Sequence, residues 1–136
     1  MRILGIDYGD ARIGIALSDE LGILASPLQT YQSQSMRKDI DYIASLAKEK
    51  NCGKIVIGLP LNMNGTEGDR VSKTKSFGNV LEKVAGMPVV YKDERLTTVQ
   101  VERVFEQANV KKDKRKQIVD KTAAVLILQS YLDMKI

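Results

Sequence analysis

Acidic residues stand at three widely separated places in the chain where a carboxylate could do chemistry. Asp7 ends the apolar segment that begins the chain, and Asp93 and Glu94 follow a second apolar segment. Asp120 lies in a late segment whose apolar residues repeat with a helical period. Carboxylates suit hard divalent cations such as Mg²⁺ or Mn²⁺, and the chain contains no His. Two such ions about 4 Å apart can activate a water and stabilise the leaving oxygen during hydrolysis of a phosphodiester.

Asp120 is the most informative of these acids. On a helix it shares a face with Ala124 and Ile127, and this apolar face should pack on a sheet. A carboxylate on such a face needs a cation, a metal ion or a hydrogen-bonding partner. A salt bridge to Lys116 or Lys121 is the structural alternative.

The other two positions also have structural explanations. Asp7 could bond backbone amides in the turn around Gly9, and Asp93 or Glu94 could favour the positive end of a following helix. An ionised carboxylate at the end of a buried strand is nevertheless costly without a partner. In open α/β sheets, ligand crevices form at the carboxyl ends of the strands. Both positions therefore remain candidates for catalysis.

The basic charge of the chain is concentrated in one segment, residues 111–121 (KKDKRKQIVDK). This basic segment holds six Lys or Arg and two Asp, which accounts for the whole net charge of +4. Such a cluster is an electrostatic footprint for phosphate groups, although a solvated helix start or loop can have the same composition. Aromatic residues make up 5% of the chain, so stacking on bases is not the expected mode of recognition.

Hydrophobic periodicity predicts the elements that position these residues. Strands are expected at 2–8 and 12–18, as a hairpin, and at 23–30, where Pro27 indicates a sheet edge. Helix 69–85 is expected to turn inward the residues Val71, Phe77, Val80, Leu81 and Val84. The remaining elements are helix 35–50, strand 54–58, strand 89–91, a helix that begins at a capping box of Thr97 and Gln100, and helix 114–131.

The order of these elements predicts a single α/β domain over residues 1–136. A strand meander followed by alternating helices and strands gives a mixed sheet with helices on its faces, and right-handed crossovers place the later strands beside the first. Cys52 is the single cysteine, which excludes a disulfide framework and, without His, the usual zinc sites. No apolar run is long enough to span a bilayer or to form a signal-peptide core, so a cytoplasmic location is expected.

Four segments of the chain together resemble one known family: ILGIDYGDARIGIALSD, IVIGLPLNMNGTEG, YKDERLTT and DKTAAVLILQSYL. They resemble the YqgF family of Holliday-junction resolvases, also described as pre-16S rRNA nucleases. The resemblance implies an RNase H-like fold, with a five-stranded mixed sheet flanked by helices. It also implies catalytic, metal-binding acids at Asp7, Glu94 and Asp120. In RNase H-like nucleases the second acid commonly follows the fourth strand, whereas Glu94 follows the fifth, so Asp93 or Glu67 could share its role.

Further residues of these motifs are expected to contact the substrate. The glycine-rich loop at 62–68 resembles a family loop beside the active site, and the motif that contains Glu94 continues into the next residues. Together with the basic segment, the predicted substrate-binding residues are Asn62, Asn64, Gly65, Arg95, Thr97, Lys111, Lys112, Lys114, Arg115 and Lys116.

The expected function is that of a metal-dependent endonuclease that matures the 5′ end of pre-16S rRNA, with Mg²⁺ or Mn²⁺ bound among the three acids. The expected partners are nucleic acid, either precursor rRNA or branched DNA, and ribosomal assembly proteins, with no membrane, and the protein is a monomer or a homodimer. Holliday-junction resolution is the first alternative and would need a dimer that delivers paired cuts. A non-catalytic RNA-binding factor on the same fold is the second, and an actin-like ATPase would need two such domains.

Overall fold

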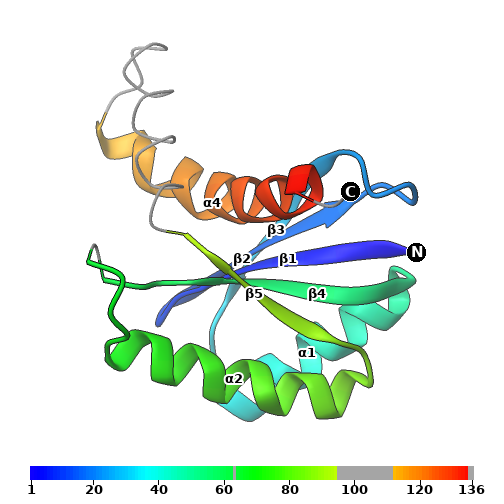
Figure 1. Cartoon of the computed structure of the whole chain (residues 1–136), viewed down its shortest axis with the longest axis horizontal. Helices are drawn as coiled ribbons and strands as arrows, with labels where there is room; N and C mark the ends of the chain where they lie inside the picture. Colours follow the sequence, from blue (N-terminus) through cyan, green and yellow to red (C-terminus); the bar gives the residue numbers. More distant parts are fainter. Residues whose placement is uncertain (63, 95–111, 135–136) are drawn as a thin grey trace.

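Five strands form the middle layer of a three-layer molecule (Figure 1). The computed structural model describes residues 1–62, 64–94 and 112–134, and within 112–122 it describes the helical backbone but not the side chains. The strands are β1 (Arg2–Tyr8), β2 (Arg12–Ser18), β3 (Ala25–Gln32), β4 (Cys52–Leu59) and β5 (Val89–Asp93).

The sheet has the strand order β3-β2-β1-β4-β5. Strands β1 and β3 run antiparallel to β2, whereas β1, β4 and β5 run parallel to one another. This confirms the predicted mixed sheet, with the later strands beside β1 and the strand that carries Pro27 at an edge. The carboxyl ends of β1, β4 and β5 meet at one end of the sheet, which is where α/β proteins usually place their ligand sites.

Helices cover both faces of the sheet (Figure 1). Helices α1 (Met36–Glu49) and α2 (Asp69–Ala85) lie on one face, and α4 (Lys112–Met134) lies on the other. The helix expected to begin at Thr97 falls outside the described residues. Within the described ranges, no helix is both long enough and apolar enough to cross a membrane.

Local backbone geometry sets the boundaries of two elements. Helix α2 ends at Gly86, whose φ of 68° is left-handed and therefore favours glycine. The Asp19 carboxylate accepts hydrogen bonds from the N–H groups of Ile23 (2.7 Å) and Leu24 (3.2 Å). Because these bonds hold the turn together, β3 begins at Ala25, two residues later than the sequence predicts.

Alternation along the strands assigns their side chains to the two faces. In β1, Leu4, Ile6 and Tyr8 join the core under α1 and α2, and the ring of Tyr8 stacks on Phe77 with 4.2 Å between ring centroids. The large, fully buried members of this core are Leu4, Ile6, Ile13, Ile15, Ile43, Ile55, Ile57, Phe77 and Leu81.

Of the described side chains, fewer belong to the core between the sheet and α4. A Cβ built on Gly5 would lie 2.7 Å from Leu128 Cβ and 3.2 Å from the Ala124 carbonyl oxygen, so α4 packs directly against the backbone of β1. The buried apolar residues of this face are Ile3, Ala16, Val56, Ala124, Ile127, Leu128 and Leu132.

Helix α2 buries a narrower stripe than the sequence predicts. Val80 and Val84 were expected to face inward, but they are 43% and 42% exposed. The buried residues of α2 recur at alternating spacings of three and four, as in Val71, Thr74 and Gly78, and each of the two valines lies one position before a member of this stripe. One position on a helix is a rotation of about 100°, which carries both side chains out of the interface.

Candidate active site

Asp7 lies near the carboxyl end of β1, on the face covered by α4. Its cross-strand partner in β2 is Gly14, and in β4 Gly58 follows Ile57, which is the partner of Ile6. Paired residues of neighbouring strands point to the same face of a sheet. Asp7 therefore stands between two glycines, so neither β2 nor β4 places a side chain of its own directly beside the Asp7 carboxylate.

Glu94 reaches the same place from the carboxyl end of β5. It is the first residue after β5, and its backbone N–H donates a hydrogen bond of 3.2 Å to the Leu59 carbonyl oxygen. A Cβ at Gly58 would overlap both Glu94 Oε2 and Ile127 Cδ1. Glycine at position 58 thus makes the room in which the Glu94 carboxylate lies, between β4 and α4.

The two carboxyl groups interact electrostatically. The pKa of Glu94 is raised from its ordinary 4.5 to about 7, chiefly by burial and next by the negative charge of Asp7. The charge of Asp93 adds a smaller increase, while the positive charge of Arg70 lowers the pKa. Two acids from separate strands therefore share one partly buried site, as carboxylate pairs at catalytic centres commonly do.

Arg70, in the first turn of α2, is a member of this site that the sequence did not reveal. One of its guanidinium nitrogens donates a hydrogen bond of 3.0 Å to the carbonyl oxygen of Tyr8, the residue after Asp7. Another forms an ion pair of 2.8 Å with Asp10. Arg70 and Tyr8 are 62 positions apart in the chain, so no local sequence pattern could have indicated their contact.

The third predicted acid and most of the basic residues are placed only by the backbone. Position 120 lies in α4 one turn before Ala124, and its side chain is outside the described residues. The same holds for Lys112, Lys114, Arg115 and Lys116, which belong to the first half of α4, while Arg95, Thr97 and Lys111 are outside the described residues altogether. Their roles stay predictions.

The loop before α2 is an exposed, internally hydrogen-bonded turn. The Asn64 side-chain oxygen accepts hydrogen bonds from both the N–H (3.1 Å) and the hydroxyl (2.6 Å) of Thr66. The Asn62 amide donates to the same hydroxyl at 3.0 Å, and its backbone N–H donates to the Thr66 carbonyl. Gly65 adopts a φ of 86°, which this turn requires. The predicted substrate-binding residues Asn62, Asn64 and Gly65 thus belong to one hydrogen-bonded turn a few residues before α2.

The two alternatives for the second acid, Glu67 and Asp93, are both exposed. Glu67 forms an exposed ion pair of 2.7 Å with Lys75. Asp93 is the exposed last residue of β5 and affects Glu94 less than Asp7 does.

The pair of Asp7 and Glu94 fits a hard divalent cation. Both groups offer carboxylate oxygens, and burial together with the charge of Asp7 raises the pKa of Glu94, so a cation bound there would stabilise the ionised form of Glu94. Within residues 1–62, 64–94 and 123–134, three or more His, Cys, Asp or Glu side chains do not gather into a metal-binding group. A third protein ligand would have to come from outside these ranges, as the prediction for Asp120 supposes.

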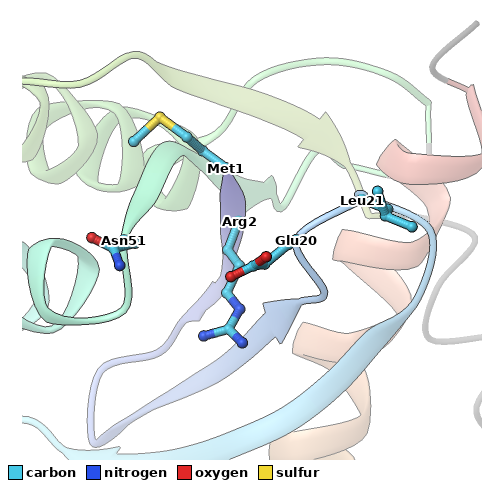
Figure 2. Close-up of a pocket in the computed structure, with 5 residues that line it drawn as sticks. All are labelled: Met1, Arg2, Glu20, Leu21 and Asn51. Atoms are coloured by element: carbon cyan, nitrogen blue, oxygen red, sulfur yellow. The ribbon is translucent and has the colours of Figure 1, made fainter.

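A hollow at the opposite end of the sheet contains none of these residues. Figure 2 shows this pocket of about 420 Å³ at the start of β1. Its lining residues are Met1, Arg2, Glu20, Leu21 and Asn51. One carboxylate beside one guanidinium does not reproduce the acid pair, so the carboxyl end of the sheet is the candidate active site.

Comparison with known proteins finds relatives that match almost the whole chain. A family model described as "RuvX: Holliday junction resolvase" matches residues 1–134. The chain is 50% identical over 133 residues to a "Putative pre-16S rRNA nuclease" of Syntrophus aciditrophicus (98% of this chain, 89% of that one). It is 47% identical over 136 residues to the protein of the same name from Streptococcus thermophilus (98% of each).

Solved structures confirm the RNase H-like fold. The structure of Thermus thermophilus RuvC in complex with Holliday junction substrate superposes with a TM-score of 0.62, covering 99% of this chain and 97% of that one. Sequence identity in that comparison is 15%, so the likeness concerns the fold.

Proposed function

This chain belongs to the RuvX family of Holliday junction resolvases, and from that premise we propose that it is a metal-dependent endonuclease that cleaves precursor 16S rRNA. Family membership and the names of its relatives make it a nuclease, and therefore a hydrolase. The relatives named for pre-16S rRNA are about half identical to it, which supports the RNA substrate and a cytoplasmic place of action.

The observation that carries the proposal is the meeting of Asp7 and Glu94 at one end of the sheet. The chain brings them together through parallel strands β1 and β5, separated by β4, in which Gly58 leaves the space for the second carboxylate. Burial and the neighbouring charge raise the pKa of Glu94, a cost that a purely structural loop would have no reason to retain.

In the proposed mechanism, Asp7, Glu94 and Asp120 hold Mg²⁺ or Mn²⁺. When bound, such ions supply an activated water and stabilise the departing 3′-oxygen. The protein contributes rigid placement: β1 fixes Asp7, the Glu94 backbone is tied to Leu59, and α4 packs on Gly5 one turn beyond position 120. Because the backbones of Asp7 and Glu94 are held in this way, these two ligands need little rearrangement before the reaction.

The first test replaces Asp7. Asp7→Asn keeps the shape of the side chain and removes its charge, and cleavage of precursor 16S rRNA should fall by about 10³-fold because charge stabilisation in the transition state is lost. Circular dichroism should show an unchanged fold. Asp41→Asn, an exposed position on α1, is the matched control and should cleave as the wild type does. Equal cleavage rates for wild type and Asp7→Asn would reject the proposal.

The second test concerns the substrate. The family description supports Holliday junction resolution as the second candidate function. Precursor 16S rRNA and a four-way DNA junction, offered separately with Mg²⁺, distinguish the two, because symmetrical paired cuts in the junction would favour resolution. If neither substrate is cut and both bind equally with and without Mg²⁺, the protein is a non-catalytic binding factor.

A further inference from the structure

A small cluster of charges borders the acid pair on the side of α2. It consists of Asp10 in the turn after β1, and Arg70 and Lys73 in the first turns of α2. Asp10 pairs with both cations at 2.8 Å, so the cluster carries two positive charges and one negative charge. We name these three residues the rim cluster.

Arg70 is fixed in place by the backbone of β1. Its bond to the Tyr8 carbonyl joins α2 to the residue directly after Asp7, so the guanidinium cannot swing far from the acid pair. Its positive charge acts on Glu94, which shows that it lies within electrostatic reach of the second carboxylate as well. The guanidinium therefore sits at the border of the candidate active site and not on a remote surface.

The rim cluster is open to a ligand. The side chains of Arg70, Lys73 and Asp10 are 44%, 51% and 65% exposed. An arginine has five N–H donors, and in the described part of the chain the contacts with Tyr8 and Asp10 engage two of its nitrogens. Exposed ion pairs add little to stability, so the pairing with Asp10 is a weak reason for two cations to gather here.

We propose that Arg70, assisted by Lys73, binds a backbone phosphate of the nucleic-acid strand next to the phosphodiester that is cut. Arginine suits this task because its planar fork matches two phosphate oxygens at once. Asp10 then competes with the phosphate for the same donors, while the Tyr8 carbonyl keeps the guanidinium oriented. This inference rests on the proposed nuclease function and assigns to it a binding residue that the basic segment does not contain.

The positions of the acids and of Arg70 define the path of the bound strand across the protein. The acids face α4, whereas Arg70 belongs to α2 in the layer on the other side of the sheet (Figure 1). A strand that contacts both must cross the carboxyl end of the sheet from one layer to the other. The hydrogen-bonded turn that contains Asn62 and Asn64 precedes α2 in the chain.

The experiment measures binding separately from cleavage. A fluorescein-labelled 20-nucleotide RNA and a labelled four-way DNA junction are titrated with wild type, Arg70→Gln, Arg70→Lys and Asp10→Asn in EDTA, across a range of salt concentrations. Lys83→Gln is the matched control, because Lys83 is an exposed cation in the last turn of the same helix, about 20 Å away. Thermal unfolding of every variant is followed by circular dichroism.

Arg70→Gln should bind RNA about 10-fold more weakly. The slope of log affinity against log salt should become shallower by about one, as expected when one phosphate contact is lost. Arg70→Lys should recover part of the affinity because it keeps the charge but not the fork. Asp10→Asn should bind as tightly as wild type or up to about fivefold more tightly. In Mg²⁺, Arg70→Gln should raise KM more than it lowers kcat.

Two results would overturn the inference. One is a salt slope for Arg70→Gln equal to that of wild type and Lys83→Gln. The other is a loss of affinity in Asp10→Asn as large as in Arg70→Gln, together with lowered melting temperatures, because both variants would then merely loosen α2 from β1.

Failure of the inference and failure of the proposed function give different results. If wild type cleaves, Asp7→Asn does not, and Arg70→Gln behaves as wild type, only the phosphate contact is wrong. If wild type cleaves nothing while Arg70→Gln still reduces the salt slope, the phosphate contact stands and the nuclease function fails.

Discussion

The two faces of the sheet are built from the same strands for different tasks. On the face covered by α1 and α2, large apolar side chains interlock, as in the stacked pair of Tyr8 and Phe77. On the face covered by α4, glycines such as Gly5 and Gly58 let the helix and the Glu94 carboxylate approach the backbone. Among the side chains that the structure describes, one face therefore supplies most of the apolar burial, and the other supplies space and charge.

This difference shows how neighbouring residues of one strand can be given separate tasks. Ile6 is fully buried in the larger core, and Asp7, the next residue, faces α4 beside two glycines. Alternation makes the division available without any change of fold. The raised pKa of Glu94 is destabilising when that group is ionised, and burial on the opposite face offsets it.

The largest expected effect tests the face that should carry stability. Leu81→Ala removes a fully buried side chain from the core under α1 and α2, and should lower the free energy of unfolding by about 2–5 kcal/mol. Urea unfolding measures this loss. Val80→Ala, at an exposed neighbouring position, is the control and should change stability by less than about 0.5 kcal/mol. Cleavage per folded molecule should stay unchanged, and a large fall in it would contradict the division between faces.

Most of the fold could be predicted because its signals are local. Strand alternation and helical periodicity gave the element types and the mixed sheet, and parallel strands predict that residues at their carboxyl ends meet, as Asp7 and Glu94 do. The exposure of Val80 depends on the width of the packed stripe, which periodicity leaves open. The contact of Arg70 with Tyr8 depends on how α2 lies against β1, and no spacing in the sequence encodes that angle.

A second change tests the crowded point of the α4 face. Gly58→Ala would place a methyl group against Glu94 Oε2 and Ile127 Cδ1, so it should lower the free energy of unfolding by about 1–3 kcal/mol and displace the carboxylate from Asp7. Cleavage should fall together with stability, unlike in Leu81→Ala. Gly53→Ala in the same strand is the control, because the added methyl would meet the flexible end of Met1 at 3.0 Å. Wild-type cleavage by Gly58→Ala would show that the site tolerates a displaced Glu94.

The smallest expected effect concerns pH. A carboxyl whose pKa is higher in the folded than in the unfolded protein favours folding only while protonated. For Glu94 this contribution is complete below pH 4.5 and is lost as the pH rises to about 7. In EDTA, wild type should therefore lose about 1–2 kcal/mol relative to Glu94→Gln between pH 4.5 and pH 8, after allowance for partial exposure. Urea unfolding at several pH values measures the difference, and parallel curves for the two proteins would contradict the burial of this group.

The alternation of β1 also limits how this chain can change in length. Inserting or deleting one residue ahead of Asp7 would turn its carboxylate into the apolar core and bring Ile6 under α4. The pairing of Asp7 with Gly14 would be lost at the same time. A compensating insertion or deletion in β2 alone could not repair this damage. Additions and deletions among relatives should therefore collect in turns such as residues 19–24, while the count of residues inside β1 stays fixed.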